Sequence, residues 1–128
     1  MNEPSKDLDF LAHEVIGASI EVHRLLGPGF LESVYEEALS IEMAMRRIPF
    51  ARQVVVGLNY KNHTVGNGKL DFLIGGNLIV EPKAVDALAP IHSAQVLSYL
   101  KTTGFHLGLL INFNTVVLKN GLKRIILS

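Results

Sequence analysis

Hydrophobic positions in the first 50 residues recur at spacings of three and four, the period of a helix with one buried face. This spacing predicts an amphipathic helix over about residues 7–26. Gly27-Pro28-Gly29 should end it, because glycine suits a left-handed cap and proline cannot continue a helix. A second helix is predicted over about residues 30–47, before Pro49. We expect this second helix to bury Phe30, Leu31, Val34, Ala38, Leu39 and Met45.

From Gln53 onward the hydrophobic residues fall into short runs rich in β-branched side chains, which favour strands. Three strands are predicted, over residues 54–60, 69–74 and 78–83. Residues 61–64 and 75–77 lie between these runs and contain the asparagine and glycine residues typical of turns. The three strands should therefore form an antiparallel meander.

The last third of the chain predicts one more helix and three more strands. Helical spacing returns over about residues 90–103, and 107–113 is an apolar run typical of a strand buried on both faces. Residues 116–118 and 124–127 are predicted to form a closing hairpin with Asn120-Gly121 as its turn. The order ααβββαβββ predicts an α/β fold, a mixed β-sheet flanked by helices, in a single domain over residues 1–128.

The composition indicates a folded protein with a substantial core. The 128 residues are 48% hydrophobic and 19% charged, which excludes disorder as the dominant state. The absence of cysteine excludes disulfides and thiolate chemistry. No apolar run is long enough for a membrane helix and the acidic start does not resemble a signal peptide, so we expect a cytoplasmic protein. High hydrophobicity in so small a domain predicts a homodimer or a partner protein.

The net charge of zero conceals an asymmetry between the two parts of the chain. Residues 1–50 contain nine acidic and four basic residues, whereas residues 51–128 contain three acidic and eight basic residues. The first part is therefore predicted to expose acidic helix faces, and the second a mildly basic surface that phosphate groups would suit. Overall neutrality argues against tight non-specific binding of nucleic acid.

Three charged residues lie within apolar strand segments. These are Asp71 in the second predicted strand, and Glu81 and Lys83 in the third. Because side chains alternate along a strand, Glu81 and Lys83 point to the same face. A charge in such a segment loses hydration and is tolerated when it is paired or bound to an ion. The residues therefore form either an ordinary ion-pair ladder on a half-exposed sheet or a functional site.

The length of the loop between the second and third strands decides whether Asp71 and Glu81 meet. A two-residue loop at Gly75-Gly76 would place them on opposite faces. A three-residue loop over 75–77 would place them opposite each other on one face. Directly opposed carboxylates repel unless a cation lies between them, so a shared site requires the longer loop or an equivalent bulge.

Asp71 followed by a short hairpin and Glu81-x-Lys83 resembles the signature of the PD-(D/E)XK nuclease superfamily. Residues 29–35 also read Gly-x-x-Glu-x-x-Tyr, and this string together with segments 22–28, 92–101 and 108–114 resembles the GxxExxY family, a branch of that superfamily. The resemblance extends over about residues 8–127. It implies a restriction-endonuclease-like core that hydrolyses phosphodiester bonds of nucleic acid, either DNA or RNA, with Mg²⁺ or Mn²⁺.

The resemblance also implies roles for individual residues. Asp71, Glu81 and the backbone carbonyl of Pro82 would hold Mg²⁺, which prefers hard oxygen ligands. Glu32 would be an outer or second ligand. Lys83 would orient or deprotonate the attacking water and offset negative charge in the transition state. Gln95 and Tyr99 are candidate substrate-binding residues. They share a helix face with His92 that is either solvated or lines a substrate groove.

A second hypothesis is a catalytically silent binding or regulatory module that keeps the nuclease fold. The neutral net charge favours it, and so does Pro82, which stands where this family usually has an aliphatic residue. Proline removes a backbone N–H and is unfavourable in a central strand, although its carbonyl remains. Among the histidines, His23 is predicted to have a packing or capping role, and no pair has the spacing of a zinc site.

Overall fold

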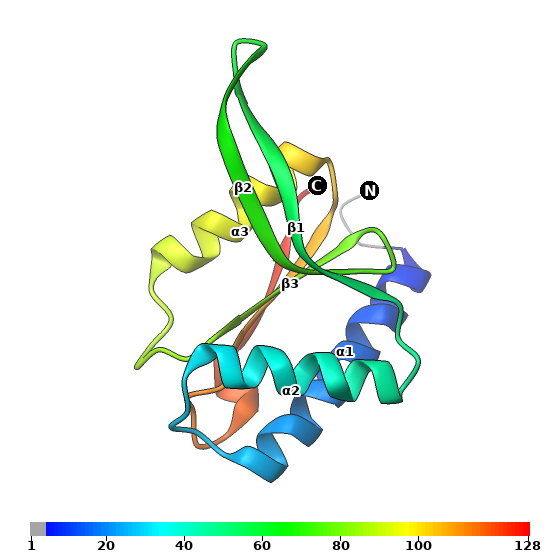
Figure 1. Cartoon of the computed structure of the whole chain (residues 1–128), viewed down its shortest axis with the longest axis vertical. Helices are drawn as coiled ribbons and strands as arrows, with labels where there is room; N and C mark the ends of the chain where they lie inside the picture. The colour runs from blue at the N-terminus through cyan, green and yellow to red at the C-terminus, as the bar shows by residue number, and fades with distance from the viewer. Residues whose placement is uncertain (1–4) are drawn as a thin grey trace.

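The computed structural model describes residues 5–128 and shows a five-stranded mixed sheet with helices on both faces (Figure 1). The elements are α1 (Lys6–Leu26), α2 (Glu32–Met45), β1 (Phe50–Tyr60), β2 (His63–Ile74), β3 (Leu78–Lys83), α3 (Pro90–Thr103), β4 (Leu107–Asn112), the short 3₁₀ helix η1 (Leu118–Gly121) and β5 (Leu122–Ile126). The predicted fold class is therefore confirmed. Over the described residues, no helix has the length and apolar character needed to cross a membrane.

The strands lie in the order β1-β2-β3-β4-β5. Only β3 and β4 are parallel, and they are joined through α3, whereas every other neighbouring pair is antiparallel. This agrees with the general rule that parallel strands need a long crossover, usually a helix. The predicted meander of β1, β2 and β3 is confirmed.

The predicted strand over residues 116–118 is absent, so the element order is ααβββαββ. The Asn120-Gly121 turn belongs to η1 instead of a hairpin. Leu118 is buried in the core beneath the helices, which draws this segment across the end of the sheet. All of β5 pairs with β4, and β5 is an edge strand of the sheet.

Helix α2 buries a different face from the one that we predicted. Met45 is 75% exposed and Leu31 76% exposed, and Phe30 and Val34 are also exposed. The helix begins only at Glu32 and buries a stripe four residues apart: Tyr35, Leu39 and Met43, with Ser40 beside it. Of the predicted core positions, Leu39 is fully buried and Ala38 packs against the core.

The sheet separates two hydrophobic cores. The larger lies between the sheet and helices α1 and α2, and includes Phe72, Val80 and Leu109. The smaller lies beneath α3 and includes Ile79, Val96 and Leu110. Helix α3 approaches the sheet closely at Gly108, where an added Cβ would lie 2.5 Å from a methyl group of Val96. A larger residue at position 108 would push α3 away from the sheet.

The β1–β2 hairpin extends well beyond the sheet (Figure 1). Pairing of β2 with β3 covers only residues 72–74 and 78–80, whereas β1 and β2 pair as far as Tyr60 and His63. Strand β2 begins at His63, earlier than predicted, because the outer part of the hairpin is polar and exposed and lacks the apolar pattern of a packed strand. Strand β1 ends at Tyr60 as predicted but begins at Phe50, four residues earlier than expected. We call residues 57–67 of this hairpin the arm.

Candidate active site

Asp71 and Glu81 lie next to each other at the point where β2 leaves β3. The connection between these strands consists of residues 75–77, and Phe72 pairs with Val80, which places Asp71 opposite Glu81. The backbone N–H of Asp71 donates a 2.8 Å hydrogen bond to Oε2 of Glu81. The three-residue loop that a shared site requires is therefore present.

The backbone of β2 passes from one core to the other at Asp71. Leu70 packs in the core beneath α3, whereas Phe72 packs in the core beneath α1 and α2. Across the strand pair, Gln53 adopts a positive φ of 53° and does not join the ladder between β1 and β2. The interrupted ladder leaves Asp71 at the edge of both cores, half-buried, so its carboxylate can face a ligand.

Burial raises the pKa values of both carboxyl groups. Glu81 is only 4% exposed, and this burial, together with the adjacent charge of Asp71, raises the pKa of Glu81 to about 8. Burial also raises the pKa of Asp71, followed in size by the charges of Glu36 and Glu32. At neutral pH the buried Glu81 carboxyl therefore retains a proton when no cation is nearby.

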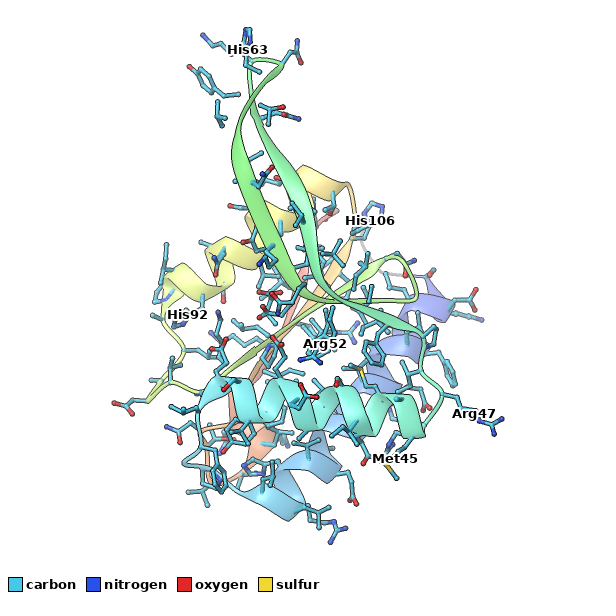
Figure 2. The ribbon with its side chains drawn as sticks, in the orientation of Figure 1. Met45, Arg47, Arg52, His63, His92 and His106 are labelled. Atoms are coloured by element: carbon cyan, nitrogen blue, oxygen red, sulfur yellow. The ribbon has the colours of Figure 1, made fainter. Side chains whose placement is uncertain are left out.

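Two glutamates of α2 face this pair. Glu32 is the first residue of α2 and Glu36 lies one turn further, and the charge of each acts on Asp71. Glu36 is held by β1: it accepts 2.9 Å hydrogen bonds from Arg52 and from Gln53. Figure 2 shows Arg52 between the hairpin and α2. Sequence reasoning missed Glu36, and its spacing of four residues from Glu32 is the signal that places both on one helix face.

Lys83 lies at the end of β3, two residues beyond Glu81, and is half-buried. Its positive charge lowers the pKa values of both Asp71 and Glu81, so it lies within electrostatic reach of the pair. The carbonyl of Lys83 accepts a 2.9 Å hydrogen bond from the N–H of Phe113. Three of the predicted site residues are thus brought together.

The same hydrogen bond explains how β3 accommodates Pro82. Backbone groups of successive strand residues point to opposite edges, and those of Lys83 point towards β4. The backbone of Pro82 therefore points towards β2, where pairing has already ended at Phe72 and Val80. No ladder hydrogen bond is lost there, as expected for proline in a sheet. The carbonyl of Pro82 remains on the side of Asp71.

The donor set suits a hard divalent cation with few protein ligands. Within residues 5–128, no three histidine, aspartate or glutamate side chains lie close enough to hold one ion together. Glu32 therefore acts on Asp71 through its charge without completing a three-carboxylate group. Mg²⁺ is commonly bound by one or two carboxylates together with waters and substrate phosphates, so Asp71, Glu81 and the carbonyl of Pro82 fit it.

Comparison with protein families connects this geometry to a known group. The model of the PD-(D/E)XK nuclease superfamily matches residues 9–125. The chain belongs to this superfamily. Neither the curated proteins nor the solved structures that were compared gave a match. Membership indicates a nuclease-like function on nucleic acid, and PD-(D/E)XK nucleases generally use divalent metal ions.

In this PD-(D/E)XK protein, Tyr35 fixes the loop that precedes α2. The ring of Tyr35 is fully buried and stacks on Phe113, with centroids 4.8 Å apart. Its hydroxyl donates a 2.6 Å hydrogen bond to the carbonyl of Gly27 and accepts one from the N–H of Phe30. Gly27 and Gly29 both adopt positive φ values, which glycine allows. Tyr35 thus sets where α2 begins, and Glu32 is its first residue.

We expect Tyr35→Phe to lower the free energy of unfolding by about 1 kcal/mol, because the hydrogen bonds of the hydroxyl to the half-buried carbonyl of Gly27 and to the N–H of Phe30 are lost. Urea unfolding at neutral pH measures this loss. Tyr60→Phe is the matched control, since Tyr60 is 62% exposed and the change should stay within about 0.5 kcal/mol. A loss no larger in Tyr35→Phe than in the control would contradict the structural role given to the hydroxyl.

Asn112 fixes the chain just after Lys83. Asn112 is 1% exposed, and its side-chain amide donates a 2.9 Å hydrogen bond to the carbonyl of Val85. Its side-chain oxygen accepts from the N–H groups of Val85 and Asn114. The Asn112 side chain thus makes the hydrogen bonds that a neighbouring strand would otherwise make to the segment after β3. This positioning residue was not predicted from the sequence, where a single asparagine at the end of an apolar run gives no specific signal.

The predicted substrate-binding residues lie along a groove of α3. Gln95 and Tyr99 line a cavity of about 570 Å³ with His92 and with Leu58 of β1. The ring of Tyr99 lies so close to Gly68 of β2 that a Cβ there would be 2.6 Å from it. Over the described residues, neither Gln95 nor Tyr99 makes a hydrogen bond to Asp71 or Glu81. They remain candidates for substrate contact, in a groove that neither Asp71 nor Glu81 lines.

Where histidine side chains form hydrogen bonds, these bonds connect parts of the fold. Nδ1 of His92 accepts from the N–H of Ala89 and caps the start of α3. Nε2 of His23 lies 2.7 Å from the carbonyl oxygen of Thr115 and ties α1 to the segment after β4. The predicted packing role of His23 is thus confirmed.

Proposed function

We propose that this PD-(D/E)XK protein is a Mg²⁺-dependent nuclease of the GxxExxY branch that hydrolyses phosphodiester bonds in nucleic acid. Asp71, Glu81 and Lys83 would be its catalytic residues. The observation that supports this most directly is the buried Glu81, whose pKa is raised to about 8 beside Asp71. Strongly shifted carboxyl groups that share a location with a lysine are typical of functional sites.

A bound Mg²⁺ would polarise the scissile phosphate and lower the pKa of a coordinated water. Asp71, Glu81 and the carbonyl of Pro82 would hold the ion. The burial of Glu81 and its backbone hydrogen bond from Asp71 keep the two carboxylates aligned for this task. Mn²⁺ has similar ligand preferences and should replace Mg²⁺.

The remaining residues would act on the water and the phosphate. The Lys83 ammonium would orient the attacking water and offset the negative charge that develops on the phosphoryl oxygens. Alternatively, a Lys83 that is already a neutral amine would accept the proton of that water and become the ammonium that offsets this charge. Glu32, at the start of α2, would bind a water of the outer coordination shell. Gln95 and Tyr99, in the groove of α3, would contact the nucleic acid next to the scissile bond.

The experiment is a calorimetric titration of the metal-free protein with Mg²⁺ and with Mn²⁺, for the wild type, Glu81→Gln and the control Glu14→Gln. Each protein is then incubated with a mixture of single- and double-stranded DNA and RNA. Metal binding and metal-dependent cleavage that are both lost only in Glu81→Gln would support the proposal.

Two other outcomes would contradict it. Metal binding by the wild type without cleavage of any nucleic acid would favour the second hypothesis, a silent binding or regulatory module. No metal binding, even with nucleic acid present, would mean that the carboxylate pair is only a structural element of the fold.

We also propose that two copies of the chain associate through the outer face of α1 and α2. Leu25, Ile41 and Met45 are 55–75% exposed and line a groove of about 350 Å³ between these helices. Figure 2 shows Met45 pointing away from the molecule. Two ion pairs with charges of both signs, Glu21–Arg24 and Glu42–Arg46, border this face. In a dimer with two-fold symmetry, the acidic groups of one copy would lie opposite the basic groups of the other.

We expect wild-type protein to sediment at twice the mass of the 14.0 kDa chain, and Ile41→Glu to sediment as a monomer. A glutamate in the middle of an apolar interface would be buried without a partner. Val55→Glu, on the exposed face of β1, should remain dimeric. A wild-type monomer at micromolar concentration would contradict this assembly.

A further inference from the structure

The outer part of the arm is a two-stranded ribbon to which the proposed chemistry assigns no role. Residues 57–67 are exposed except for the half-buried Leu58. They pair only with each other, because β3 reaches β2 no further than Phe72. Figure 1 shows the ribbon projecting from one end of the sheet, and Figure 2 shows His63 at its tip. Packing in the hydrophobic core therefore does not explain this projection.

The tip of the arm has a defined conformation. Lys61 and Asn62 both have positive φ values, 47° and 66°, as a two-residue type I′ hairpin turn requires. The hydroxyl of Thr64 donates a 3.2 Å hydrogen bond across the hairpin to Asn59. The ammonium of Lys61 lies 5.5 Å from the ring centroid of Tyr60. These contacts present the polar side chains of the tip in a fixed pattern.

The charge of the arm suits a polyanion. No acidic residue occurs from Phe50 to Leu70. Lys61 lies at the tip of the arm and Lys69 just beyond its base, whereas Arg52 is paired with Glu36 and Glu37. Near the tip, Asn59 lines a depression of about 300 Å³ with Lys101 of α3, so the positive charge of Lys101 lies beside the arm. The acidic residues of the chain are concentrated instead in residues 1–50, which hold nine of them.

The arm carries side chains of the kinds that hydrogen-bond to base edges. Asn59, Asn62 and Asn67 carry amides, and Lys61 carries an ammonium group. Asparagine pairs with adenine and lysine with guanine in the major groove of DNA. That groove is about 12 Å wide and admits a two-stranded ribbon, whereas the major groove of double-stranded RNA is too narrow to be read this way.

We propose that the arm inserts its tip into the major groove of double-stranded DNA and thereby selects which phosphodiester bond reaches Asp71 and Glu81. This inference rests on the proposed nuclease function, since it names the substrate of the same site. Eight residues of β2 separate His63 from Asp71, about 27 Å of extended strand. The bases that the tip contacts would therefore lie away from the bond that is cut.

The test measures binding alone, by fluorescence anisotropy in EDTA, so that no cleavage occurs. The probes are a 20-base-pair DNA duplex, one strand of that duplex, and the RNA duplex of the same sequence. The variants are Lys61→Ala/His63→Ala and the control Lys119→Ala/Lys123→Ala, which removes exposed cations from η1 and β5. Thermal unfolding of each variant confirms that the fold is intact.

We expect the wild type to prefer duplex DNA, and Lys61→Ala/His63→Ala to bind it about tenfold more weakly. The slope of log affinity against log salt should fall by about 1 in that variant and not in the control, because the Lys61 cation no longer displaces a counterion from the DNA. Unchanged binding in the arm variant would overturn the inference. Equal or tighter binding of single strands or of the RNA duplex would overturn it too, as would a wild type that binds none of the probes.

Cleavage assays separate this inference from the nuclease proposal. DNA binding that depends on the arm, in a protein that cleaves no nucleic acid with Mg²⁺, would support the proposed role of the arm and contradict the proposed nuclease function. Metal-dependent cleavage, in a protein whose DNA binding does not depend on the arm, would support the proposed nuclease function and contradict the proposed role of the arm.

Discussion

Lys83→Met should lower metal-dependent cleavage about 10²–10⁴-fold while the affinity for Mg²⁺ changes by only a few-fold. The ammonium group of Lys83 cannot bind a cation, so its removal leaves the oxygen ligands in place. Methionine retains most of the length of the side chain and fills the same half-buried position. Single-turnover cleavage rates, with calorimetry for the metal, measure the two effects separately.

The control for this change is Lys119→Met, which removes an exposed lysine of η1. It should cleave at the wild-type rate. Lys83→Met protein that cleaves as fast as the wild type would show that Lys83 only neutralises the buried carboxyl pair. Loss of metal binding and cleavage together would show that it shapes the ligand set.

Metal-free protein should become less stable as the pH rises from 4.5 towards and beyond 8. The pKa of Glu81 is about 8 in the folded chain against an ordinary value of 4.5, so the unfolded chain binds fewer protons in this interval. Stability from this group is fully present below pH 4.5 and is lost as the pH rises through 8, by up to about 1.4 kcal/mol per pH unit. The raised pKa of Asp71 acts in the same direction.

Urea unfolding in EDTA from pH 5 to pH 9 measures this dependence. Glu81→Gln removes the titrating group and should flatten the curve, whereas Glu14→Gln should keep the wild-type slope. Stability that rises with pH over this interval in the wild type would show that Glu81 is ionised in the folded protein.

The same proton connects stability with metal binding. Glu81 must be ionised to bind a cation, so the binding of Mg²⁺ at pH 7 should release close to one proton. Calorimetry in two buffers of different ionisation enthalpy measures the number released. Release of no proton at pH 7 would contradict the raised pKa.

The sequence predicted those elements whose limits are set by local chemistry. Helix α3 begins at Pro90 and ends before Gly104 as expected, because both residues act within one turn of the helix. The pairing of Asp71 with Glu81 was left open between two loop lengths, and the structure has the longer one. Periodicity alone does not distinguish them, since both loops contain glycine.

What the sequence did not predict depends on contacts between distant segments. Glu36 faces Asp71 only because Arg52 and Gln53 of β1 hold it there. The buried face of α2 depends on the stacking of Tyr35 on Phe113, which lies far along the chain. The Asn120-Gly121 dipeptide is typical of a hairpin, but burial of the nearby Leu118 favours a 3₁₀ turn.

The hydrogen-bond ladder between β1 and β2 is interrupted at Gln53 and Asp71. We expect the hairpin to bend at this point, which we call the pivot. Strands joined by fewer hydrogen bonds there bend more easily than the sheet below, while Glu81 stays anchored in β3 between β2 and β4. The tip lies about 27 Å of extended strand from Asp71, so a rotation of about 5° at the pivot would move it by roughly 2 Å. Asp71 itself lies on the pivot. A force on the tip would therefore turn the backbone at Asp71 directly, and would reach Glu81 through the hydrogen bond from the Asp71 N–H.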